Sequence, residues 1–141
     1  MIEVRQHMFT KEMPNTISKM YDSVYKAEET FEKDFLMEKE SGQGEYSLFF
    51  KTREGERFFF TGFKYSLYQC TQNWFWFGVD ICWNEQVVKA FSQRHENVFI
   101  RFENFLLCPI PEEALEKENF LEETTKIIGE ELEALKAVLN Q

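Results

Sequence analysis

The sequence predicts an α+β fold, in which a mainly antiparallel sheet of four or five strands packs with an N-terminal helix, a short middle helix and a long C-terminal helix. Three observations predict it. Apolar residues recur at helical spacing near both ends of the chain, strand-like alternation fills the middle, and the first two alternating segments are joined by a glycine-containing turn. With 141 residues, 43 % hydrophobic and 29 % charged, the chain fits a single globular domain spanning 1–141.

Three segments carry the helical signals. The first, Asn15–Leu36, follows a proline, and its apolar residues recur every three or four positions until glycines end the pattern. The second, Glu85–Arg94, is short, and Asn84 can cap its first turn. The third follows Pro111 and keeps one apolar stripe from 120 to 139. We expect one continuous helix in this last segment.

The register of the first hairpin follows from its turn. The strands Tyr46–Lys51 and Phe58–Tyr68 flank Glu54-Gly55, which fits a two-residue turn with glycine at positive φ. Counting back from this turn gives a set of pairs that share one face of the sheet. These pairs are Phe50 with Phe59, Leu48 with Thr61, and Tyr46 with Phe63.

The second hairpin is predicted from the polar loop 69–73, which would place Tyr68 opposite Trp74. The same count pairs Phe63 with Val79 on the face that the first hairpin also marks as the core. A fourth strand is expected over Val98–Glu103, with its apolar positions 98, 100 and 102 on that core face. Two independent counts therefore agree on one buried side.

The other face of the sheet is unusually aromatic, above all in the stretch NWFWFGVDICW at 73–83. It would carry six rings: Phe49, Phe58, Phe60, Tyr68, Trp74 and Trp76. In the predicted register Lys64 lies opposite Gly78 and Asp80 opposite Gly62, which makes a shallow dip holding an ion pair. Six rings exceed the apolar patch that a monomer usually exposes. Two interpretations follow: a helix covers this face in a three-layer fold, or the face is partly open and holds a ligand, a peptide or a second copy.

No pattern of catalytic or metal-binding residues is present, and no cofactor is predicted. The sequence has no glycine-rich phosphate loop, no nucleophile motif and no zinc spacing, and neither His7 nor His95 has a partner for nucleophilic catalysis. An acid–lysine pair inside a sheet is more often structural than catalytic. The cysteines at 70, 82 and 108 are an odd number at wide spacing, so we interpret them as reduced thiols in the cytoplasm.

The charge of the chain points to its class of partner. The net charge is −9, and residues 112–141 alone carry 9 acids and 3 bases. Such a chain repels nucleic acid, and it has no apolar run long enough for a signal peptide or a membrane span. We therefore expect a non-catalytic intracellular binding protein, inhibitor- or immunity-like in profile, whose partner is another, basic protein or a second copy of the chain.

The alternative function is a small-molecule-binding protein or an enzyme that uses the aromatic sheet face with Lys64, Asp80 and Arg101. Both hypotheses draw on one set of candidate binding residues. These are Trp74, Trp76, Tyr68, Phe60, Lys64, Asp80 and Arg101.

Overall fold

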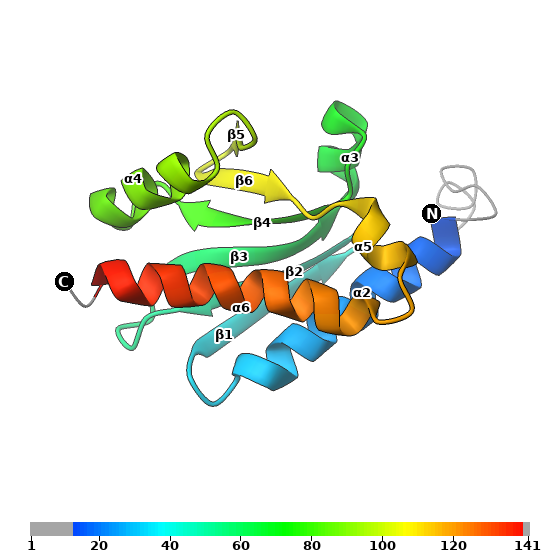
Figure 1. Cartoon of the computed structure of the whole chain (residues 1–141), viewed down its shortest axis with the longest axis horizontal. Helices are drawn as coiled ribbons and strands as arrows, with labels where there is room; N and C mark the ends of the chain where they lie inside the picture. Colours follow the sequence, from blue (N-terminus) through cyan, green and yellow to red (C-terminus); the bar gives the residue numbers. More distant parts are fainter. Residues whose placement is uncertain (1–12, 140–141) are drawn as a thin grey trace.

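The computed structural model describes residues 13–139, which form a six-stranded sheet with most of the helices on one side of it (Figure 1). His7, named above, lies outside these residues. The elements are α2 (Met13–Phe31), β1 (Leu36–Gly42), β2 (Glu45–Lys51), β3 (Arg57–Lys64), α3 (Tyr65–Thr71), β4 (Phe75–Asp80), α4 (Glu85–Arg94), β5 (Ile100–Phe102), β6 (Phe105–Pro109), α5 (Glu112–Glu116) and α6 (Phe120–Leu139).

The sheet has the strand order β1-β2-β3-β4-β6-β5, and every neighbouring pair is antiparallel. The α+β prediction is confirmed, although the sheet has six strands rather than four or five. One face of the sheet and the helices α2, α4, α5 and α6 share a single core. The helices contribute Met20, Val24, Ala27, Val87, Phe91, Ala114, Leu115, Ile128, Leu132 and Leu135 to it.

The helix boundaries correct two predictions and confirm a third. The first helix ends at Phe31, not Leu36, because the chain turns there and continues as the edge strand β1. The long C-terminal helix is confirmed as α6, but it does not extend back to Pro111, because residues 117–119 separate it from the short helix α5. The middle helix has the predicted bounds, and the Asn84 side chain accepts hydrogen bonds from the backbone nitrogens of residues 86 and 87 at 2.9 and 3.1 Å.

The predicted pairs between β2 and β3 are confirmed, from Tyr46–Phe63 to Phe50–Phe59. The turn is longer than predicted, because the register shifts after Phe50 and the loop closes through a 2.8 Å hydrogen bond from Thr52 N to Glu56 O. Gly55 takes the expected positive φ, 88°. At this irregularity Phe58, expected on the second face, belongs to the main core instead.

The predicted register of β3 and β4 is wrong by four residues. The strand β3 ends at Lys64, and residues 65–71 form the helix α3 rather than continuing the strand. Phe63 therefore pairs with Phe75, and Val79 pairs with Phe59. Because the slip is an even number, each side chain keeps its face. Phe75, Phe77 and Val79 lie in the main core, as predicted.

The strand predicted over 98–103 is shorter and faces the other way. β5 covers only Ile100–Phe102 and pairs with β6, a strand that the sequence analysis missed. Ile100 and Phe102 pack on the second face of the sheet, while β6 supplies Leu106 and Cys108 to the main core. β6 lies between β5 and β4, so the sheet ends in a tight hairpin.

Two glycines allow the sheet to curl strongly. A Cβ on Gly62 would lie 2.2 Å from Tyr46 O, and a Cβ on Gly78 would lie 1.9 Å from Leu106 O, so each neighbouring strand approaches where a side chain would stand. Both positions belong to the second face, so the sheet bends toward it. The Phe49 and Phe105 rings are only 6.1 Å apart, although three strand spacings would separate them by about 14 Å in a flat sheet.

Candidate functional site

The second face of the sheet forms a compact aromatic cluster, which we call the second-face cluster. Its buried members are Phe49, Phe60, Leu67, Trp76 and Leu107. No helical layer lies over it, so the three-layer interpretation is wrong; Leu67 of α3 and the apolar residues of the β5–β6 hairpin close it. The space left among these side chains is only about 10 Å³. The curl of the sheet, rather than a helix, buries the rings.

Two cations stand over rings of this cluster. The Arg57 guanidinium carbon lies 3.9 Å from the Phe49 ring centroid, and Lys64 Nζ lies 5.8 Å from the Phe60 centroid. Such cation–π contacts are favourable where the cation keeps its access to water. Arg57 also forms ion pairs across β2 with Glu38 and Glu40 of the edge strand β1. The rim of the second-face cluster is therefore of mixed charge, because Glu38, Glu40 and Glu103 lie there beside the two cations.

The predicted binding residues separate into several places. Phe60, Trp76 and Lys64 lie at the second-face cluster. Tyr68 and Trp74 stack on each other with centroids 4.7 Å apart and pack against the main core. Arg101 is exposed on β5, and Asp80 ends β4, where its carboxylate accepts a 2.8 Å hydrogen bond from the backbone nitrogen of residue 82. Whether any of them binds a partner stays a prediction.

The predicted Lys64–Asp80 ion pair is wrong. Lys64 N donates to Trp74 O, and Asp80 pairs with Phe105 of β6. Since Phe59 pairs with Val79, the two charges are six residues apart along the strands, or about 20 Å. The glycines that were expected to make room for these side chains instead admit the backbone of neighbouring strands.

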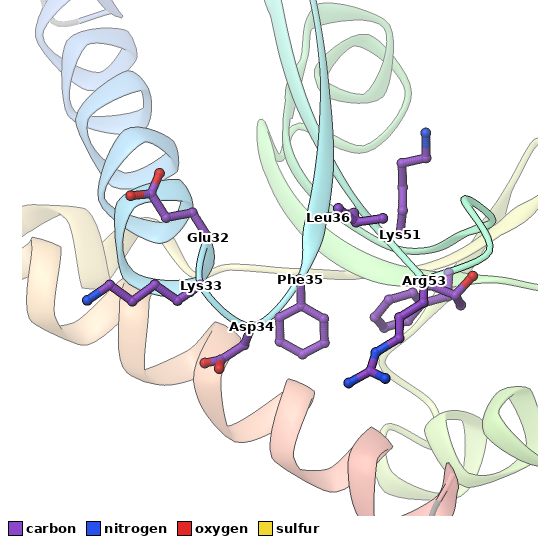
Figure 2. A pocket seen from close by; sticks show the side chains of 9 residues that line it. Glu32, Lys33, Asp34, Phe35, Leu36, Lys51 and Arg53 are labelled. Atoms are coloured by element: carbon purple, nitrogen blue, oxygen red, sulfur yellow. The ribbon is translucent and has the colours of Figure 1, made fainter.

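A hollow that the sequence analysis did not predict lies between the α2–β1 connection and the β2–β3 loop (Figure 2). Its volume is about 420 Å³. Its lining residues are Glu32, Lys33, Asp34, Phe35, Leu36, Lys51, Thr52, Arg53 and Phe58. They come from two separate stretches of chain with no shared motif, so no sequence signal could have joined them.

A buried carboxylate joins α4 to α6. Glu131 Oε1 accepts hydrogen bonds from Arg94 Nη2 at 3.0 Å and His95 Nε2 at 2.7 Å, and Glu131 is 4 % exposed. Within residues 13–139, its Oε2 atom has no hydrogen-bond partner. The position has a sequence signal that was missed, since it lies three residues after Ile128, on the apolar stripe of the helix.

Burial also changes the acidity of a thiol in the core. Desolvation, with a smaller contribution from the Glu131 carboxylate, raises the pKa of Cys108 to about 12. Its thiol is therefore neutral at physiological pH, and the thiolate is the reactive form of a cysteine. The other two cysteines are exposed, and all three are free.

The outer surface of α5 and α6 is acidic. Ion pairs engage two of its acids, Glu123 with Lys117 at 3.8 Å and Glu133 with Lys136 at 3.7 Å. Six further glutamates are exposed and have no ion pair with any cation of residues 13–139. They are Glu112, Glu113, Glu116, Glu118, Glu122 and Glu130. We call these six residues the acidic helical surface.

The described part of the chain offers neither a membrane span nor a metal centre. None of its helices is both long and apolar enough to cross a bilayer. Its histidines, cysteines and acids form no group of three or more that could ligate a metal ion.

Comparisons of the chain with models of protein families, with curated proteins and with solved structures found no match.

Proposed function

We propose that this chain is a non-catalytic, cytoplasmic binding protein that engages a basic surface of another protein, with an inhibitor- or immunity-like profile. The observation that carries the proposal is the acidic helical surface, whose six glutamates have no ion-pair partner among residues 13–139. Clustered carboxylates of one sign repel each other, and a basic partner relieves that repulsion and associates faster because of long-range attraction.

The packing of the second-face cluster favours this proposal over a ligand on the aromatic sheet face. Small-molecule sites occupy roughly 300–1,000 Å³, whereas the space in this cluster is about 10 Å³. Lys64, Asp80 and Arg101, the charged residues of that alternative, also lie on separate elements and do not converge. A partner that binds the helical side needs no cavity.

The test compares two variants with the same change in net charge. The first replaces three glutamates of the acidic helical surface by glutamine, at Glu118, Glu122 and Glu130. The matched control replaces three exposed glutamates on other elements, at Glu54, Glu56 and Glu96. The probe is a lysine-rich oligopeptide, and its binding is followed by calorimetry at about 0.15 M salt, where the screening length is about 8 Å.

We expect the helical variant to bind the peptide about tenfold more weakly, since three exposed charge contacts contribute roughly 0.2–1 kcal/mol each. The control variant should lose less than about twofold. An equal loss in both would mean that only net charge matters, and would contradict the proposal. Capture from native cytoplasm with both variants then identifies the partner as the protein that the control retains and the helical variant loses.

A further inference from the structure

The hollow of Figure 2 has the volume of a small-molecule site, and its otherwise polar lining includes three apolar side chains. Its volume of about 420 Å³ lies within the usual range for such sites. The Phe35 and Phe58 rings, with centroids 5.8 Å apart, form its aromatic part. Phe35 packs on Phe50 at 5.7 Å and Phe58 on Trp83 at 5.0 Å, so both rings are held in place before any ligand arrives. Leu36, 54 % exposed, adds an apolar wall.

Arg53 is the charged residue of this hollow whose side chain can bind a ligand. Figure 2 shows its guanidinium beside the Phe35 ring, while the side chains of Glu32 and Lys33 point away. Within residues 13–139, no carboxylate lies within ion-pair distance of Arg53. By contrast Lys51, on the same wall, is engaged by a glutamate of β1 at 3.5 Å. Arg101 likewise has no ion pair within residues 13–139, but it lies on β5, away from this hollow.

The chemistry of these groups indicates the class of ligand. A guanidinium offers two parallel N–H donors that match a carboxylate, and aromatic rings favour a flat apolar body. Asp34 lies on the far side of the Phe35 ring from Arg53, so a second negative group on the ligand would be repelled there (Figure 2).

Two other described cations lie near the hollow. Lys33 has no ion pair within residues 13–139 but points away (Figure 2), and Lys136 Nζ, 5.2 Å from the Phe35 ring centroid, pairs with Glu133 at 3.7 Å. A phosphate dianion would therefore find Arg53 as its one unpaired cation, among the described residues, that faces the hollow.

We propose that the hollow binds a small aromatic monocarboxylic acid, with its carboxylate on the Arg53 guanidinium and its ring against Phe35. The site is separate from the acidic helical surface, and it does not depend on the function proposed above. The recognition is non-covalent and leaves the ligand unchanged.

The test uses 2-naphthoate as the probe and 2-naphthamide as its uncharged analogue. Binding is followed by calorimetry, with the tryptophan emission of the chain as a second signal, because Trp83 contacts the Phe58 ring of the hollow. Two variants are compared: Arg53→Gln removes the cation in the hollow, and Arg101→Gln removes an exposed arginine elsewhere with the same change in charge. Arg53 is exposed in a loop, so the variant should keep its melting temperature.

We expect 2-naphthoate to bind at millimolar or tighter dissociation constants. Its affinity should fall about tenfold in Arg53→Gln and stay within twofold in Arg101→Gln, and 2-naphthamide should bind the unmodified chain about tenfold more weakly. The proposal is overturned if 2-naphthoate does not bind, if both variants bind it alike, or if the amide binds as well as the acid. Phenyl phosphate binding more tightly than 2-naphthoate would also overturn it. The glutamine variants of the acidic helical surface should bind 2-naphthoate unchanged, so the two proposals fail separately.

Discussion

Replacing Gly78 by alanine should destabilise the fold far more than the addition of one methyl group suggests. The new Cβ would lie 1.9 Å from Leu106 O and 2.7 Å from a methyl carbon of Leu107. Both neighbours belong to β6, and one of them is backbone, so no change of side-chain rotamer relieves the contact. β4 and β6 must move apart at the centre of their pairing.

The magnitude follows from that displacement. Normal contacts of a Cβ begin near 3.0 Å, so the strands must separate by about 1 Å, and overpacking of this kind costs roughly 1–3 kcal/mol. One or two interstrand hydrogen bonds would lengthen as well, at about 1 kcal/mol each. We therefore expect a loss of about 2–5 kcal/mol, against a typical total stability of about 5–15 kcal/mol.

Urea unfolding followed by fluorescence measures this loss, and two other glycines serve as controls. Gly55 has a φ of 88° and no atom within 4 Å, so alanine there should cost only about 1 kcal/mol, from the backbone conformation. Gly129 lies within α6 at 3.3 Å from a ring carbon of Phe31, and the higher helix propensity of alanine should offset the contact to within about 1 kcal/mol. A loss below about 1 kcal/mol for Gly78→Ala would refute the close approach of the strands, and with it the curled sheet.

Three further predictions concern single groups. Iodoacetamide at neutral pH should label the two exposed cysteines and spare Cys108, which should react only after unfolding. Because the pKa of Cys108 is raised in the folded state, the contribution of its neutral thiol to stability should be complete below about pH 8.5. That contribution should fall as the pH rises toward 12. Labelling of all three cysteines in the folded chain would contradict the burial of Cys108. Glu131→Gln should lower the unfolding free energy by about 1–2 kcal/mol in thermal melts because it weakens two hydrogen bonds, one of them to the Arg94 guanidinium. The exposed Glu130→Gln should stay within about 0.5 kcal/mol, and equal effects would contradict the assignment. A double-mutant cycle on Lys64 and Asp80 should give a coupling below about 0.5 kcal/mol, and a coupling above about 1 kcal/mol would restore the register predicted from the sequence.

The faces of the central strands were predictable because strand periodicity tolerates an even slip in register. The pairs of β2 with β3 came out correctly, since their turn holds a recognisable glycine. The β3–β4 pairs did not, because residues 65–71 alternate like a strand but fold as α3, whose end is marked only by Gln72 at a φ of 68°. Helix and strand cannot be told apart by pattern over so short a stretch.

Two strands escaped prediction for opposite reasons. β1 reads Leu-Met-Glu-Lys-Glu-Ser-Gly and has no apolar alternation, because as an edge strand it is largely exposed. β6 is nearly all apolar because both of its faces are buried, with Leu106 in the main core and Leu107 in the second-face cluster. The hollow was equally invisible, since packing alone brings its two stretches of chain together.

The composition of β1 has a consequence for self-association. An open sheet edge is a template on which another chain can add a strand, and charged residues on an edge strand oppose this. β1 carries three consecutive charges, Glu38, Lys39 and Glu40, and ion pairs tie them to Glu28 of α2 and to Arg57 of β3. The opposite edge, β5, is three residues long, too short to template a stable ladder. Strand addition and fibril growth are thereby disfavoured at both edges, and a second copy of this chain would have to dock through a face of the molecule instead.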